Sequence, residues 1–123
     1  MATLRNVSTM EQDIFCEIVK GEIRSKPVYK DREFIVLNDI NPQAPVHLLI
    51  VSRKHFTDLD GFKGVHAGML GRGLLIAEKI SKKVGLKNGY RIIINRGPDS
   101  ERGVPHFHIH VLGGKKLGAK IVK

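Results

Sequence analysis

The chain has 123 residues, 41% of them hydrophobic, and its formal net charge at pH 7 is +9. This length and composition predict one globular domain with a modest core. No apolar run approaches the ~18 residues that span a membrane, so we expect no membrane association. The polar N-terminus shows no signal peptide, and the single cysteine, Cys16, favours a reducing compartment. We therefore expect a cytoplasmic protein, with the nucleus as a second location in a eukaryote.

The positive charge raises the question of nucleic-acid binding. The basic residues are scattered along the chain, and the aromatic residues are only two tyrosines and five phenylalanines, with no tryptophan. Proteins that bind single strands combine basic charge with aromatic stacking platforms. We therefore expect the charge to attract small anionic nucleotides, and we do not expect nucleic acid to be the main partner.

The N-terminal part of the chain predicts a flexible arm over residues 1–10, followed by a single domain over residues 11–123. Apolar residues at helical spacing predict a short helix over 11–20, with Gly21 in the stop position. Runs of strand-forming residues follow, and they predict strands over 27–31, 34–39 and 46–52.

A long helix is predicted from Lys63 to Val84, ended by Gly85. Three glycines lower its intrinsic stability by about 1 kcal/mol each relative to alanine, so packing must hold it. Its expected core stripe consists of Val65, Met69, Leu70, Leu74, Ile76, Ala77, Ile80 and Val84. Two further strands are predicted at 90–95 and 106–112. The expected fold class is α+β, with a five-stranded antiparallel sheet, one long helix and one short helix.

Three histidines, His106, His108 and His110, alternate with apolar residues in the last predicted strand. Alternate residues of a strand share one face, so this strand has an imidazole face and a hydrocarbon face. A surface strand with chance histidines is one interpretation, and a metal site is another. The Cα atoms of His106 and His110 would lie roughly 13 Å apart, which disfavours one ion shared by all three. Imidazole titrates near neutral pH and its two nitrogens can take different roles, which favours polar or nucleophilic chemistry.

Two other segments carry candidate binding groups. The turn-rich loop 96–103 and Asn95 offer backbone N–H groups and an amide near the histidine strand, a mixture that suits a phosphate. Asp39 ends a strand-forming run before a proline-rich turn, where a carboxylate either caps the turn or holds ribose hydroxyls. His47 begins the next apolar strand, so we expect it to be half-buried.

The runs 39–55 and 95–114 closely resemble the histidine-triad (HIT) nucleotide-binding proteins, whose signature is His-x-His-x-His followed by apolar residues. The Val-Leu-Gly-Gly at 111–114 resembles the HINT branch, the purine nucleoside phosphoramidases, more than the Fhit branch of dinucleoside polyphosphate hydrolases. The resemblance extends over about 13–114. It implies a HIT-like fold in which the sheets of two chains join across a homodimer.

The resemblance also implies roles for individual residues. His108 would be the nucleophile that attacks the α-phosphorus, His110 would bind phosphoryl oxygen, and His106 and His47 would orient them. The resemblance also implies a nucleotide-binding set that includes His108 and His110. Its other members are Asp39 and Ile40 at the ribose, Ile14, Phe15 and Leu37 around the purine, and Asn95, Glu101, Arg102 and Gly103 at the phosphate.

The implied activity is cleavage of purine nucleoside 5′-phosphoramidates, of the AMP-amine or AMP-lysine type, to the nucleoside monophosphate and the amine. The reaction would pass through a nucleotidyl-histidine, need no cofactor, and use AMP, GMP and adenosine phosphoramidates as ligands. Two alternatives stay open. One is a dinucleoside polyphosphate hydrolase or another HIT nucleotidyl hydrolase, and the other is a nucleotide-binding interaction protein with incidental hydrolysis.

Two positions and the C-terminal tail depart from the family pattern. HINT members usually have a serine where this chain has Gly103, and the C-terminal tail differs from the family's Trp-Pro-Pro-Gly ending. A serine hydroxyl restored at Gly103 would be expected to help basic amines leave. The family often carries a Cys-x-x-Cys zinc pair, but here Asp13 stands at the first position and Cys16 at the second. With half of the pair missing, we expect no metal.

Overall fold

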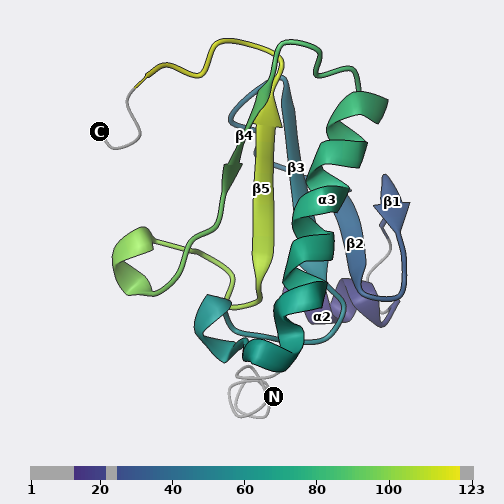
Figure 1. Ribbon diagram of the computed structural model, residues 1–123, viewed down its shortest axis with the longest axis vertical. Helices are drawn as coiled ribbons and strands as arrows, with labels where there is room; N and C mark the ends of the chain where they lie inside the picture. Colours follow the sequence, from purple (N-terminus) through teal and green to yellow (C-terminus); the bar gives the residue numbers. More distant parts are fainter. Residues whose placement is uncertain (1–12, 22–24, 120–123) are drawn as a thin grey trace.

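The computed structural model describes residues 13–21 and 25–119, so the arm predicted for residues 1–10 lies outside the described part. The main elements form an α+β arrangement, in which three consecutive strands separate the short helix from the long one and two further strands follow (Figure 1). In chain order they are α2 (Ile14–Val19), β1 (Tyr29–Lys30), β2 (Phe34–Asn38), β3 (Val46–Ser52), the 3₁₀ turns η1 (Leu59–Gly61) and η2 (Gly64–His66), α3 (Ala67–Lys83), β4 (Tyr90–Ile93), the 3₁₀ turn η3 (Pro98–Ser100) and β5 (His108–Gly113). No helix within these residues is both long and apolar enough to cross a membrane.

The strands form one five-stranded sheet in the order β1-β2-β3-β5-β4, and every neighbouring pair is antiparallel. The predicted fold class is therefore confirmed. The register of the central pair places His108 opposite Val51 and His110 opposite Leu49. The two histidines thus lie on the same face of the sheet as these two apolar residues.

The two faces of the sheet are covered differently. In Figure 1, α3 crosses in front of the sheet, and the more distant α2 lies behind its lower end. The larger core cluster packs under α3 and includes Phe34, Ile50 and Ile109 from the strands. The smaller cluster on the opposite face joins Phe15 of α2 to strand residues that include Leu49 and Val51. Because side chains alternate along a strand, His108 and His110 belong to the α2 side.

Helix α2 begins after Asp13, whose Oδ1 accepts a hydrogen bond from the Cys16 N–H at 2.8 Å. A carboxylate at this N-cap position satisfies one of the unpaired N–H groups of the first turn. The chain leaves the helix at Gly21, which has a φ of +82°, a value that glycine adopts without strain. A short helix followed by Gly21 is thus present as predicted, but it begins at Ile14, and residues 11 and 12 of the predicted span lie outside the described residues.

The long helix differs from the prediction at its start. It begins at Ala67 instead of Lys63, because η2 occupies the residues before it. A 3₁₀ turn has three residues per turn, so the helical spacing does not extend back to Val65. Val65 is 86% exposed and does not belong to the core, and Leu74 is also exposed. The buried side of α3 is formed by Gly73, Ile76, Ala77, Ile80 and Ser81.

Two alanine substitutions test how closely α3 packs on the sheet. A Cβ at Gly73 would lie 2.9 Å from Cζ of the fully buried Phe34, whereas a Cβ at Gly71 would meet nothing within 4 Å. We expect Gly71→Ala to raise the free energy of unfolding by up to about 1 kcal/mol through helix propensity. Overpacking should make Gly73→Ala less stable than Gly71→Ala by about 1–3 kcal/mol. Urea denaturation measures both values, and equal stabilisation by the two substitutions would contradict the close packing.

Candidate active site

The ring of His108 is held by the main chain. Its Nδ1 lies 2.6 Å from the carbonyl oxygen of His106. A carbonyl can only accept, so Nδ1 carries the proton and Nε2 keeps its lone pair. Burial lowers the pKa of His108 below its ordinary value, which keeps the ring neutral near pH 7. His108 therefore has the protonation state that a nitrogen nucleophile needs.

His110 and His47 form a second hydrogen-bonded unit. Nδ1 of His47 accepts the Gln43 N–H at 3.0 Å, so the neutral ring carries its proton on Nε2. That Nε2 lies 2.9 Å from Nδ1 of His110 and 3.4 Å from Oδ2 of Asp39. His110 thus accepts at Nδ1 and presents its own Nε2–H as a donor. Burial lowers the pKa of His110 to about 4, with help from the charges of His108 and His47, so this ring is also neutral near pH 7.

Of the predicted ribose and base residues, Asp39 and Phe15 lie against these rings. Oδ1 of Asp39 accepts the Asn41 N–H at 2.8 Å, so the carboxylate caps the turn while Oδ2 faces His47. Phe15 contacts His108 edge-on with ring centroids 5.3 Å apart, and it packs in one cluster with Leu37. Ile14 is exposed on the same helix. Ile40, expected to pack beside Asp39, is instead 90% exposed.

The predicted phosphate loop starts beside the histidine strand. Strand β4 pairs with β5 as far as Ile93 and His110, and Asn95 follows two residues after the end of β4. In the loop, Glu101 has a φ of +53° and Gly103 a φ of +75°. A serine at position 103 would be strained in this conformation, so restoring the hydroxyl there would also distort the loop.

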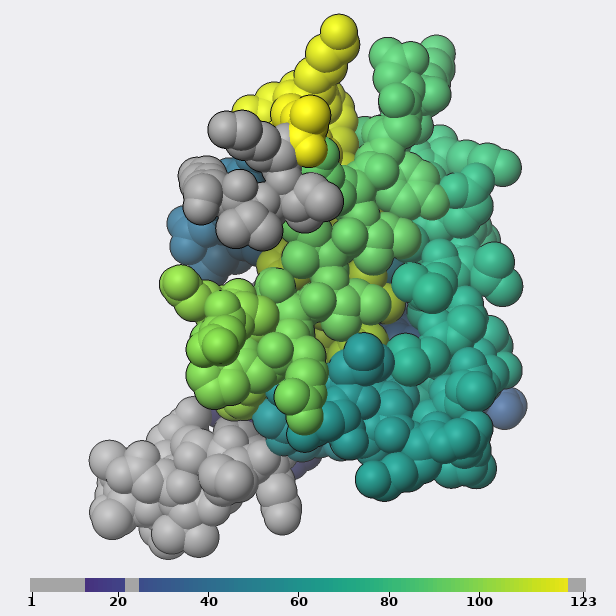
Figure 2. All heavy atoms as spheres, turned by 60° about the vertical axis from the view of Figure 1, so that its left-hand side comes forward, coloured from purple at the N-terminus to yellow at the C-terminus, as the bar shows by residue number. Residues whose placement is uncertain are grey.

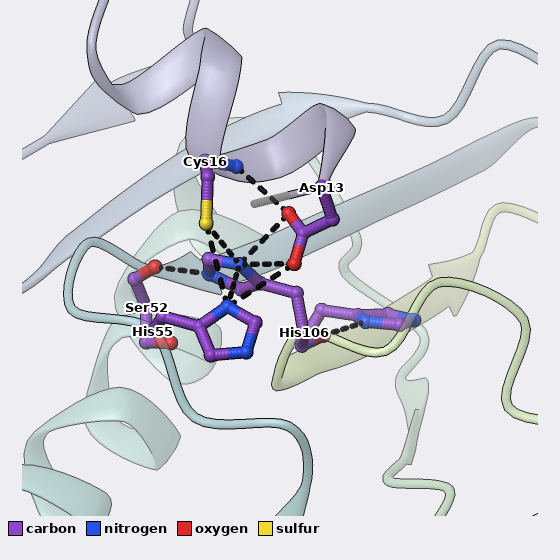
Figure 3. Close-up of polar contacts among 6 residues, drawn as sticks. Asp13, Cys16, Ser52, His55 and His106 are labelled. Atoms are coloured by element: carbon purple, nitrogen blue, oxygen red, sulfur yellow. Dashed lines mark hydrogen bonds and ion pairs between the residues drawn. The ribbon is translucent and has the colours of Figure 1, made fainter. Parts of the chain in front are cut away.

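The ring of His106 points into a buried cluster with Asp13, Cys16, Ser52 and His55 (Figure 3). His106 is fully buried, and its Nε2 donates to the Ser52 carbonyl at 2.6 Å. Its Nδ1 lies 3.0 and 3.1 Å from the two carboxylate oxygens of Asp13, 3.4 Å from Sγ of Cys16 and 3.3 Å from Nδ1 of His55. His106 was predicted to orient its neighbours; its carbonyl oxygen lies 2.6 Å from Nδ1 of His108, and its ring belongs to this cluster.

The chemistry of this cluster fits a metal ion. Since Nε2 of His106 donates to a carbonyl, Nδ1 of the neutral ring has a lone pair that faces an acidic group. Burial raises the pKa of Asp13, but a hydrogen bond shared with His106, which needs a proton between the two groups, and the bond from the Cys16 N–H outweigh burial and bring it below its ordinary value. A lone pair and a carboxylate 3.0 Å apart need a cation between them, either a proton or a metal.

The spacing of the four groups agrees with a metal site. The candidate ligand atoms of Asp13, Cys16, His55 and His106 all lie within 4.8 Å of one another. A tetrahedral zinc site with bonds of about 2.0–2.3 Å has ligand–ligand separations of roughly 3.3–3.6 Å. Asp13 thus offers a donor where the family has cysteine, so the missing first cysteine does not by itself exclude an ion. Sequence reasoning also missed His55, which is 39 residues from Cys16 and has no local pattern.

Asp39, His47 and His110 form a second group of metal-binding residue types within the described part of the chain. Here the Gln43 N–H fixes the proton on Nε2 of His47, which points at His110 and Asp39. A hydrogen bond already accounts for these short distances. This group therefore belongs to the histidine site and does not need an ion.

Known proteins are similar to this chain over most of its length. An uncharacterized HIT-like protein of Buchnera aphidicola is 44% identical over 109 residues, which cover 88% of this chain and 97% of the relative. A protein of Zea mays named 14 kDa zinc-binding protein is 41% identical over 110 residues, covering 85% of this chain and 83% of the relative.

Solved structures of HIT proteins also match this chain over most of its length. A HIT family hydrolase from Clostridium thermocellum matches with a TM-score of 0.87 and 37% identity, covering 91% of this chain and 98% of that one. A histidine triad protein from Clostridium difficile matches with a TM-score of 0.83 and 39% identity, covering 87% and 94%. The HIT domain model matches residues 20–117. The chain therefore belongs to the HIT domain family.

Proposed function

We propose that this protein is a nucleotide hydrolase that cleaves purine nucleoside 5′-phosphoramidates to the nucleoside monophosphate and an amine. The observation that carries the proposal is the state of His108, whose Nδ1 is held by the His106 carbonyl so that Nε2 keeps its lone pair. Two similar solved structures are named HIT family hydrolases, which supports hydrolysis in general. The HINT-like Val-Leu-Gly-Gly sequence supports the phosphoramidate substrate.

In the first step, the lone pair on Nε2 of His108 attacks the α-phosphorus and an N–P bond forms. The P–N bond to the leaving amine breaks, and the amine takes a proton from solvent, because Gly103 supplies no hydroxyl. In the second step, water attacks phosphorus, loses a proton to solvent and displaces His108. The Nε2–H of His110 donates to the phosphoryl oxygens in both steps, where negative charge develops.

The purine would lie against Phe15 and Leu37, with Asp39 at the ribose hydroxyls. Their proximity to His108 supports this placement. Asn95 and the loop residues Glu101, Arg102 and Gly103 would surround the phosphate. The two alternatives, a dinucleoside polyphosphate hydrolase and a binding protein with incidental activity, share this pocket and differ in turnover.

The active form would be a homodimer, as the family resemblance implies. Strand β4 lies at one edge of the sheet, and a strand edge has backbone groups that can pair with another chain. Leu75 on α3 is also exposed. The cytoplasmic location expected from the sequence stays a prediction.

Asp13, Cys16, His55 and His106 would hold a structural metal ion, with zinc the best match to one sulfur, two nitrogen and one oxygen donor. Four protein ligands leave no open position, so a bound ion would act as a cross-link between α2 and the residues around His106. The zinc-binding name of the maize relative supports this choice.

Replacing the nucleophile tests the reaction. We expect His108→Ala to abolish turnover of adenosine phosphoramidate and to leave AMP binding within a few-fold of wild type, because the base and ribose contacts remain. Quenched-flow trapping and mass spectrometry of wild type should find the nucleotidyl group on His108. An adduct on another histidine, or retained turnover in the variant, would refute the assignment.

A substrate panel separates the alternatives. Faster turnover of adenosine phosphoramidate than of diadenosine polyphosphates would support the HINT-like activity. The reverse order would support the polyphosphate hydrolase. Tight AMP binding with turnover near background on every substrate would support the binding protein.

The pH dependence follows from the lowered pKa values of His108 and His110. The neutral rings are the active forms, and burial disfavours the charged forms. As pH falls, kcat/KM should therefore stay level through pH 6.5, the ordinary histidine value, and drop only below it. Stopped-flow assays corrected for acid hydrolysis of the substrate measure the profile. A midpoint at or above 6.5 would contradict neutral, buried rings.

Metal analysis tests the cluster at Asp13. After zinc loading and dialysis, we expect about one ion per chain in wild type, a higher Tm with zinc, and loss of both in Cys16→Ser. Asp13→Asn is the sharper variant, because asparagine keeps the N-cap of α2 but removes the anionic ligand. It should bind zinc more weakly than wild type while keeping the helix. Zinc-free wild type with an unchanged Tm would show that a proton occupies the cluster.

A further inference from the structure

A buried carboxylate connects η1 to the loop 97–103. Asp58 is 5% exposed, and its Oδ2 lies 3.1 Å from Nη1 of Arg102 and accepts the Gly97 N–H, also at 3.1 Å. Its Oδ1 accepts the Asp60 N–H and caps η1. Figure 2 shows the loop, lime green, against the teal segment that contains η1. A single side chain thus contacts both ends of the loop.

The loop conformation depends on such anchoring. Gly97 and Gly103 have positive φ, and Glu101 adopts the left-handed region without being glycine. A left-handed non-glycine residue costs on the order of 1 kcal/mol or more and persists only when its surroundings enforce it. The internal bonds of the loop, such as Ser100 Oγ to the Gly97 carbonyl at 2.7 Å, close the η3 turn but do not attach it to the rest of the protein.

Asp58 and Arg102 form an ion pair of opposite charges. Burial raises the pKa of Asp58, but the hydrogen bonds from Asp60 and Gly97 and the charge of Arg102 outweigh it and hold the pKa below its ordinary value. Arg102 is mostly buried, and its Nε makes no hydrogen bond to any described residue. Without Asp58 the guanidinium would lose its counter-ion in a place where water reaches it poorly, a costly state that should displace Arg102 and the loop.

We propose that Asp58 is a positioning residue for phosphoryl recognition, acting through Arg102 and Gly97 to hold the loop 97–103 against the site of His108. The inference rests on the proposed function, which puts the phosphoryl group at this loop. Asp58 itself touches no reacting atom. Its removal should weaken the contacts to phosphate and leave the contacts to base and ribose in place.

The same two segments provide a matched control. Asp60 and Arg96 also form an ion pair, at 3.0 Å, but their side chains are 55% and 58% exposed. Exposed ion pairs contribute little to stability. Asp60→Asn therefore makes the same chemical change two residues away: it removes the exposed carboxylate, which also interacts with Asp58, but keeps Asp58 itself and the Asp60 N–H that Asp58 accepts.

The experiment compares the affinities of AMP and adenosine by calorimetry in wild type, Asp58→Asn and Asp60→Asn. We expect wild type and Asp60→Asn to prefer AMP equally. Asp58→Asn should lose about ten-fold or more in AMP affinity and less than two-fold in adenosine affinity. The single-turnover rate of adenosine phosphoramidate should fall by about 10–100-fold in Asp58→Asn, because a misplacement of about 1 Å carries a cost of that size.

Three results would overturn the inference. Equal losses for AMP and adenosine would show a general structural role, and no loss for either would show that the loop stands without Asp58. If wild type itself does not prefer AMP over adenosine, the proposed function fails, and this inference fails with it. Asp58→Glu serves as the second variant if Asp58→Asn does not fold, since it keeps the negative charge but moves the carboxylate relative to the Gly97 N–H and Arg102, and it should show a smaller selective loss of AMP affinity.

Discussion

The pairing of β3 with β5 is the constraint on which the rest of the structure depends. These two strands occupy the middle of the sheet, and their register sets which side chains of β5 face α3 and which face α2. Ile109 lies opposite Ile50 in the core under α3, and His108 lies opposite Val51 on the other side. A slip of one residue would put the imidazoles into the apolar core, so burial of one face enforces the geometry of the site.

Backbone groups then decide where the histidine protons lie. The His106 carbonyl fixes the proton of His108, the Ser52 carbonyl fixes that of His106, and the Gln43 N–H fixes that of His47. Main-chain groups do not titrate near neutral pH, and the sheet holds them in place. The three rings are therefore oriented by the fold itself, so the orientation of Nε2 of His108 does not depend on a nearby acidic side chain.

The features that could be predicted from the sequence are those that depend on a local residue pattern. Alternation over 106–112 predicted the face shared by His108 and His110, and β3 was predicted at its observed bounds. The cluster around His106 could not be predicted, because Asp13 is 93 residues away and His55 51 residues away along the chain. Only the packing of α2 against the sheet brings them together. The start of α3 was missed for a local reason: a 3₁₀ turn interrupts the helical spacing before it.

Oδ1 of Asp13 accepts the Cys16 N–H and also lies 3.0 Å from His106, so one atom caps a helix and belongs to a ligand cluster. Cysteine is not among the side chains that favour the N-cap. A lineage that exchanged Asp13 for cysteine would gain a softer ligand and lose the cap, leaving a six-residue helix dependent on its ion. With aspartate, the cap of α2, and with it the Phe15 ring beside His108, does not depend on the proposed ion. The identity of this one residue would thus set how strongly the histidine site depends on the metal supply of the cell.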